Sequence, residues 1–196
     1  MEALDYRINA TREKINLLLA SQSSKKYSLN PPISEREVVK IEQDYQITLP
    51  LEYRAFLTKI GNGGYGLLSI ERSLQCLYNE ISEDKIDNGY LKIPFIHTSA
   101  YNPFHDPYLI EMSDKCDRGE ISETEFSSVY VSFYQYSTTG TLTISLEGCA
   151  YSSFLVITGP TRGQVWFNAD AGSGGYIPSN LSFLGWYERW LDEYFQ

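Results

Sequence analysis

A chain of 196 residues in which 42% of the side chains are hydrophobic can enclose one hydrophobic core, so a single domain is expected. The formal net charge of −9 argues against a nucleic-acid-binding protein, which needs a face rich in Lys and Arg. Three cysteines without metal-ligand spacing indicate neither a disulfide framework nor a zinc site. The first residues lack the apolar stretch of a signal peptide, and no apolar run approaches the length of a membrane span. We therefore expect a cytoplasmic protein that contacts neither membranes nor nucleic acids directly.

The negative charge is concentrated in one segment. Residues 71–125 hold 12 acidic and 5 basic side chains, a net charge of −7. Such a segment is either a solvated face that keeps the protein soluble or a surface that attracts a basic partner.

Three helices are predicted in the first third of the chain. Apolar residues recur at helical spacing over residues 3–20, and a polar linker follows. A second helix should begin after Ser34, because Glu37 completes a capping box with it. The third should begin at Pro50 and end near Gly61. Residues 1–30 are therefore expected to form an N-terminal helix and linker, and residues 33–196 the core of the domain.

A glycine-rich stretch, IGNGGYG at 60–66, resembles a phosphate-binding loop at first sight. It follows a helix instead of preceding one, and no Gly-Lys-Ser/Thr ends it. We expect Gly61 to end the helix in a left-handed conformation and the chain to turn into a strand near Leu67.

The period of the sequence changes in the second half of the chain. Residues 127–137 are β-branched and aromatic and are predicted to pair with residues 141–147 as a hairpin. Residues 154–158 and 164–168 are predicted to form a second hairpin, followed by a C-terminal amphipathic helix. The fold class predicted is α+β, with a mainly antiparallel sheet and helices packed largely on one face of it. Tyr130, Tyr134 and Tyr136 would share a strand face, in the core or at an interface.

Candidate sites for chemistry are weakly supported. His97 and His105 lack the spacing of a metal site or a catalytic pair, so no catalytic, metal or cofactor-binding residue is predicted. A hydrolase that uses a pair of carboxylates remains a remote alternative, because carboxylates are too numerous for a pair to be selected. The glycine-rich stretch at 168–178 is predicted to be a mobile loop, which could present Asp170 and Tyr176 to a partner.

Taken in order, several stretches of the chain resemble the SUKH superfamily, the Smi/Knr-type domain of bacterial immunity proteins and of a fungal regulator of cell-wall glucan synthesis. The stretches that carry the resemblance are ISEREVVKIEQDYQITLPLEYRAFLTKIGNGG (33–64), IPF (93–95), GTLTISLEGCA (140–150), LVITGPTRGQVWF (155–167) and SFLGWYERWLDE (182–193). The resemblance implies an α+β fold and a non-enzymatic role. It implies an immunity protein that binds a toxin domain, often a nuclease, or alternatively an intracellular regulator similar to the glucan-synthesis members.

The acidic segment is where partner specificity is expected, since residues 71–125 match the family only loosely. The carboxylates of this segment would be attracted to the positively charged cleft of a basic toxin domain. The partner contacts expected are Asp114, Asp117, Glu120, Glu123, Asp170 and Tyr176.

Overall fold

The computed structural model describes residues 2–21, 28–75, 90–149, 151–169 and 174–194. The elements in these residues are, in chain order, α1 (Glu2–Ser21), α2 (Glu35–Asp44), α3 (Leu51–Lys59), α4 (Ile70–Gln75), the 3-10 helices η1 (Tyr90–Lys92) and η2 (Pro103–His105), α5 (Pro107–Asp117), α6 (Glu123–Ser137), β1 (Thr141–Gly148), β2 (Tyr151–Val156), β3 (Gln164–Asn168), β4 (Tyr176–Ser182) and α7 (Phe183–Tyr194). The strands form one antiparallel sheet in the order β1-β2-β3-β4. The predicted α+β class is confirmed. No helix in the described part of the chain has both the length and the apolarity needed to cross a bilayer.

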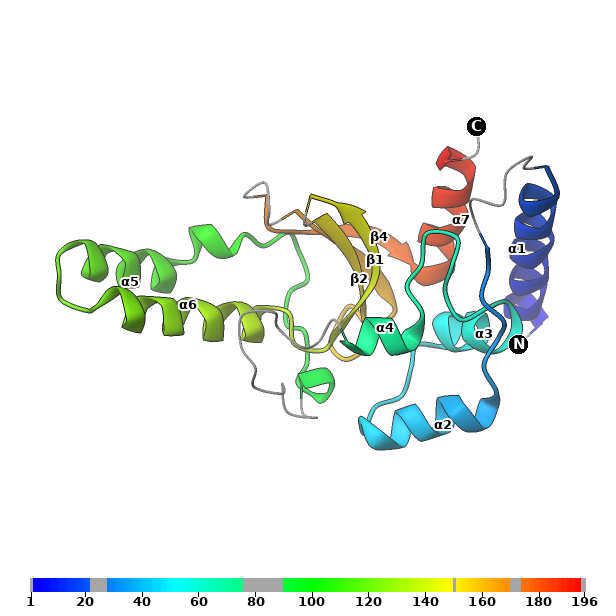
Figure 1. The fold of residues 1–196 in the computed structure, drawn as a ribbon, viewed down its shortest axis with the longest axis horizontal. Coiled ribbons are helices and arrows are strands. Elements are labelled where there is room, and N and C mark those ends of the chain that lie inside the picture. Colours follow the sequence, from blue (N-terminus) through cyan, green and yellow to red (C-terminus); the bar gives the residue numbers. More distant parts are fainter. Residues whose placement is uncertain (1, 22–27, 76–89, 150, 170–173, 195–196) are drawn as a thin grey trace.

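The larger hydrophobic cluster lies between one face of the sheet and the helices α1, α3 and α7 (Figure 1). Leu155 of β2 and Val165 of β3 point into it. Phe56 of α3 packs edge-to-face against Phe183 and Tyr187 of α7, with ring centroids 5.3 Å apart in both pairs. Each such pair contributes about 1 kcal/mol beyond the burial of its area. These aromatic contacts hold α3 and α7 together on the sheet.

The opposite face of the sheet carries a second, smaller cluster. Phe154 of β2, Trp166 of β3 and Tyr176 of β4 are buried there against Phe95. Because Phe154 and Leu155 are neighbours on one strand, their side chains point to opposite faces. This part of β2 is therefore buried on both faces of the sheet.

The N-terminal helix α1 is attached to the body by apolar and ionic contacts. Ile8 and Ile15 are buried in the larger cluster. The Arg7 guanidinium donates one hydrogen bond to Glu52 of α3, at 2.7 Å, and another to Glu188 of α7, at 2.9 Å. This side chain joins three helices, so α1 packs against the body of the protein.

The prediction of a strand at residues 127–137 was wrong, because this segment forms most of helix α6. A capping box fixes the start of the helix: Ser122 Oγ accepts a hydrogen bond from the Glu125 N–H, and Glu125 Oε2 accepts one from the Ser122 N–H. Aromatic side chains then recur at helical spacing and pack against one another. The capping box and this packing outweigh the strand propensity of the Val, Phe and Tyr residues.

Strand β1 pairs with β2 instead, through a turn in which Gly148 and Cys149 have positive φ values of 84° and 50°. The second predicted hairpin is confirmed as β2–β3. Part of the predicted loop at 168–178 is also different, since β4 begins at Tyr176. Pro178 is accommodated there because β4 is an edge strand of the sheet.

The glycine-rich stretch connects α3 to α4, and not to a strand. Gly61 ends α3 with a hydrogen bond from its N–H to the Phe56 carbonyl, but its φ is not positive. A Cβ at Gly61 would lie 2.6 Å from the Asn30 carbonyl oxygen, so close packing explains this glycine. Asn62 Oδ1 accepts a hydrogen bond from the Ile70 N–H at the start of α4. The stretch is thus a connector whose one polar side chain caps the next helix.

Candidate functional site

Helices α5 and α6 form a two-helix hairpin, here called the arm, that projects from the sheet on the side away from α1 (Figure 1). Asp106 is the N-cap of α5 and accepts a hydrogen bond from the Tyr108 N–H, and Pro107 occupies the first helical position. Gly119, with a φ of 72°, lets the chain turn between the helices. The sequence itself therefore specifies both helix starts and the turn of the arm.

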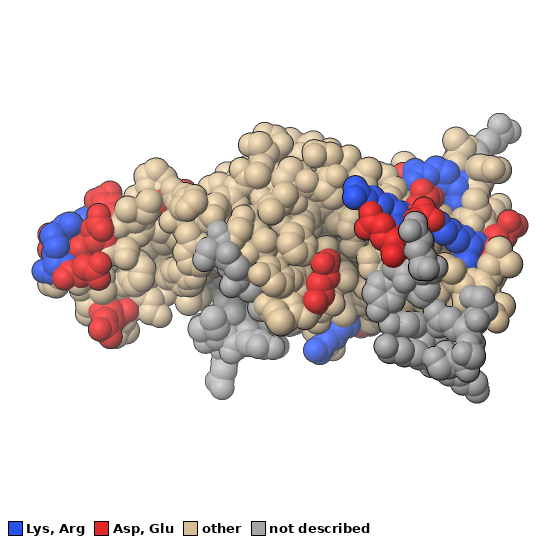
Figure 2. Space-filling view, turned by 90° about the horizontal axis from the view of Figure 1, so that it is seen from above, with Lys and Arg blue, Asp and Glu red and all other residues tan. Residues whose placement is uncertain are grey.

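The tip of the arm collects four of the predicted contact residues. Asp114 and Asp117 lie in the last turns of α5, Glu120 in the connection and Glu123 in the first turn of α6, and all four are exposed. Residues 111–125 hold six acidic and two basic side chains, a net charge of −4. Figure 2 shows charged side chains gathered at the tip and at the opposite end of the molecule, with a largely uncharged surface between.

The two basic side chains of the tip are occupied within it. Lys115 Nζ lies 2.7 Å from Glu111 Oε1, and Arg118 Nε lies 2.6 Å from Glu120 Oε1. The hydrogen bond from Lys115 lowers the pKa of Glu111, and that from Arg118 lowers the pKa of Glu120. Asp114, Asp117 and Glu123 form no ion pair with any other residue that the structure describes. Their negative charges remain available to a partner.

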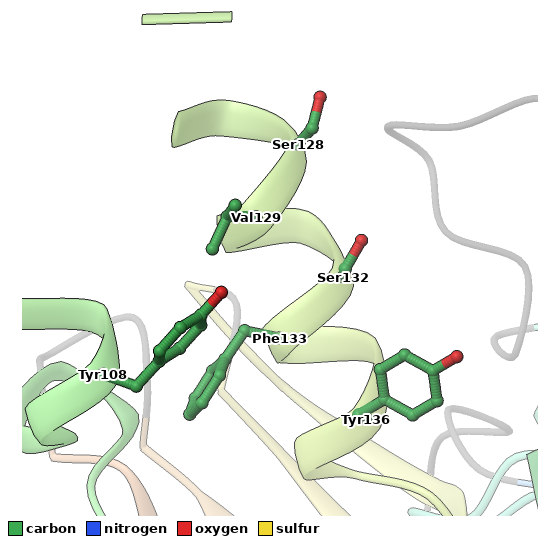
Figure 3. A pocket seen from close by; sticks show the side chains of 6 residues that line it. All are labelled: Tyr108, Ser128, Val129, Ser132, Phe133 and Tyr136. Atoms are coloured by element: carbon green, nitrogen blue, oxygen red, sulfur yellow. The ribbon is translucent and has the colours of Figure 1, made fainter. Parts of the chain in front are cut away.

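An open groove with a volume of about 400 Å³ runs along the side of the arm (Figure 3). Its walls come from both helices, and the residues that line it are Tyr108, Ser128, Val129, Ser132, Phe133 and Tyr136. Tyr108 of α5 and Phe133 of α6 stack with their ring centroids 6.3 Å apart. Tyr108 is 50% exposed and Tyr136 is 68% exposed, so much aromatic surface here faces solvent. An apolar groove beside a charged tip is typical of a protein-binding surface.

Hydrogen bonds from side chains and from the backbone fix both ends of the arm to the sheet. At the start of α5, the Tyr101 hydroxyl donates a 2.8 Å hydrogen bond to Asp106 Oδ2. The Tyr101 backbone exchanges hydrogen bonds of 3.0 and 2.7 Å with Tyr176 of β4. At the end of α6, the hydroxyls of Ser137 and Tyr176 lie 3.0 Å apart. The arm therefore projects in a defined direction from one edge of the sheet.

The remaining predicted contacts do not join this surface. Tyr176 is only 1% exposed, because its ring is buried against Phe154 and its hydroxyl against Ser137. The expectation that it contacts a partner from a loop was therefore wrong. Asp170 lies outside the described residues.

The tyrosines predicted to share a strand face lie on a helix. Tyr130 and Tyr134 pack against each other at 4.4 Å between ring centroids, whereas Tyr136 lies at the exposed groove. The sequence reasoning missed this groove because it depends on a helix at 123–137. The capping box Ser122-Glu-Thr-Glu125 was the signal that could have revealed it, as the same pattern did at Ser34 and Glu37.

The chain has two histidines, His97 and His105. His97 stacks on Tyr101, with ring centroids 4.0 Å apart, and its partial burial lowers its pKa, an effect that nearby Asp106 opposes. His105 lies in η2. No group of three His, Cys, Asp or Glu side chains within the described ranges could hold a metal ion.

The chain matches a known protein family. Residues 32–189 match the SMI1 / KNR4 family (SUKH-1), a range that includes the arm and the whole sheet but not α1. No curated protein and no solved structure matches the chain significantly. Because the match covers well over half of the chain, and because the antiparallel sheet and its helices agree with it, this chain belongs to the SMI1 / KNR4 family (SUKH-1).

Proposed function

We propose that the chain is a non-enzymatic, cytoplasmic protein-binding module, and that it acts as an immunity protein that neutralises a cognate toxin domain by direct binding. The observation that carries this proposal is the arm. It presents three carboxylates without ion-pair partners among the described residues, on Asp114, Asp117 and Glu123, next to a groove of exposed aromatic surface. Aromatic surface supplies affinity, and surrounding charge supplies orientation and rate.

The physical chemistry favours a basic partner, such as a nuclease toxin. A nuclease carries a positively charged cleft for the phosphates of its substrate. A projecting arm with a net charge of −4 over residues 111–125 can enter such a cleft and block it. Inhibition would then be steric and electrostatic and would require no chemical step by this chain. The association rate should fall as salt rises, because exposed charges are screened.

The test is rescue from toxicity: the genes next to that of this chain are searched for a toxin domain, and that domain is expressed beside this chain in a bacterial host. The wild-type chain should restore growth. The double variant Asp114→Lys/Asp117→Lys should bind the toxin domain at least about tenfold more weakly and rescue poorly. A matched control, Glu13→Lys/Asp44→Lys, reverses two exposed carboxylates on α1 and α2 and should rescue like the wild type. Failure of the wild type to bind or rescue would contradict the immunity role, and equal loss in both variants would contradict the role of the arm.

A further inference from the structure

The two helices of the arm bury few apolar side chains for their length. Among the described side chains of α5 and α6, Leu109 is the only buried apolar one. The aromatic contacts between the helices, such as Tyr108–Phe133, involve rings that stay partly exposed. Helices in proteins gain most of their stability by burying an apolar face. None of the residues that the structure describes covers the apolar face of the arm along the groove.

The groove has the form of a seat for a third helix. Its α6 residues fall at positions 128, 129, 132, 133 and 136, which form one stripe along the helix, about 12 Å long at 1.5 Å per residue. Ser128 and Ser132 carry small side chains one turn apart on the same side of α6, whereas Val129 and Phe133 point towards Tyr108 of α5 (Figure 3). Small residues allow the axis of a neighbouring helix to approach to about 8–10 Å, the usual distance between packed helices. Val129, Phe133 and Tyr136 then offer apolar surface on which it can pack.

Charge gives this seat a direction. The acidic tip lies at one end of the stripe: Glu123 precedes Ser132 by nine residues on α6, or about 14 Å along the helix. At the other end, α6 runs into Ser137 and the sheet. A bound helix would therefore be favoured when its cationic side chains lie over the tip and its apolar side chains lie over Val129 and Phe133.

Resting on the proposed function, we propose that the groove binds an amphipathic, basic α-helix of the partner as the third helix of the arm. Apolar residues of that helix, one turn apart, pack on Val129, Phe133 and Tyr136. Its Lys or Arg residues, two to three turns away, pair with the carboxylates of Asp114, Asp117 and Glu123. The arm of a second copy fits less well, because it carries the same net charge of −4 over residues 111–125 and both basic side chains in that range are already ion-paired.

A synthetic peptide provides the test, and the full chain is used. The peptide is a helical sequence of about 18 residues with Leu on one stripe and four Lys at one end, labelled for fluorescence anisotropy. A second peptide has the same composition but carries the Lys residues at the other end. Saturable binding of the first peptide, several-fold tighter than of the second, is expected at low salt.

Two serine substitutions on α6 locate the binding surface. Ser132→Tyr fills the groove and should weaken binding of the first peptide by about tenfold. Ser127→Tyr makes the same change at an exposed position outside the groove lining and should leave binding within about twofold of the wild type. Circular dichroism checks that both variants keep the helix content of the wild type.

The proposal is overturned if the peptide fails to saturate, if the two peptides bind equally, or if the two variants behave alike. It is also overturned if sedimentation shows that the chain dimerises and that Ser132→Tyr abolishes the dimer, because a second copy would then occupy the groove. The toxicity-rescue experiment is repeated with the Ser132→Tyr variant as an independent measurement. Rescue by the wild type together with a failed peptide test leaves the immunity role standing and rejects the helix in the groove.

Discussion

The side chains of Ser137 and Tyr176 meet in the interior, with their hydroxyl oxygens 3.0 Å apart. Ser137 is the last residue of α6, and Tyr176 is the first residue of β4. The Ser137 hydroxyl also lies 2.8 Å from the Tyr134 carbonyl, to which it donates a hydrogen bond. It therefore accepts from the Tyr176 hydroxyl, and one donated hydrogen bond joins the arm to the sheet.

Removing this hydroxyl should destabilise the protein. Tyr176→Phe keeps the buried ring but loses the hydrogen bond to Ser137, so the free energy of unfolding should fall by about 1 kcal/mol. Urea denaturation measures the change. Tyr6→Phe, at a 75% exposed position of α1, is the matched control and should change stability by less than about 0.5 kcal/mol. Equal effects of the two substitutions would show that the hydrogen bond between Ser137 and Tyr176 does not stabilise the attachment of the arm to the sheet.

Arg7 should contribute to the attachment of α1. Arg7→Met retains most of the aliphatic side chain but removes both hydrogen bonds, to Glu52 and to Glu188. Because these groups are partly exposed, the expected loss is about 1 kcal/mol of unfolding free energy. Exposed Arg12, hydrogen-bonded only locally to Asn9 among the described contacts, gives the control Arg12→Met. A denaturation midpoint unchanged by Arg7→Met would mean that apolar packing alone holds α1.

His97 should make stability depend on pH. Its pKa is lowered in the folded protein, chiefly by burial, so the unfolded chain binds the proton more readily. The linkage relation therefore predicts that the contribution of His97 to the free energy of unfolding is fully present above the usual histidine pKa of about 6.5. This contribution is lost as the pH falls through that value towards the lower pKa of the folded state.

Urea denaturation curves recorded from about pH 7.5 to about pH 5 measure this loss of unfolding free energy. His97→Gln should flatten the decrease across the window, because Gln does not titrate. His105→Gln leaves His97 in place and serves as the control. A wild-type curve no steeper than that of His97→Gln would contradict the prediction.

Gly159 should be far less replaceable than Gly148, although both have positive φ values. A Cβ at Gly159 would lie 2.2 Å from the Phe95 carbonyl oxygen, whereas no described atom lies within 4 Å of the Cβ position at Gly148. Gly148→Ala should cost about 1 kcal/mol for its backbone conformation alone. Gly159→Ala should cost about 3 kcal/mol or more, because the backbone at Phe95 must also move. Similar melting temperatures of the two variants would contradict the close approach.

The elements predicted correctly from sequence are those in which local signals and burial agree. Helix α2 has its capping box at Ser34 and Glu37, and a buried Val38 on its inner face. Strand β2 ends in the apolar run Phe154, Leu155 and Val156, whose side chains are buried on both faces of the sheet. In both cases the short-range pattern and the tertiary environment favour the same structure.

The errors fall where these two influences diverge. Residues 127–137 have strand-like composition, but helix α6 packs mainly against α5, and only contacts such as Tyr108–Phe133 reveal why its aromatics are present. Tyr176 follows several glycines, and its burial depends on Phe154 and Ser137, which are distant in sequence. The acidic tip was predictable because charge can be read from composition, whereas the groove was not, because it exists only between two helices.

The sparse interior of the arm also bears on how this protein can change over generations. Side chains such as Ser128, Ser132 and Tyr136 contribute little to the core on either face of the sheet. Most substitutions in a well-packed core lower stability, and selection removes those that fall below the folding threshold. Substitutions along the groove avoid most of that penalty. The arm can therefore accumulate changes in partner preference while the sheet and its helices stay the same.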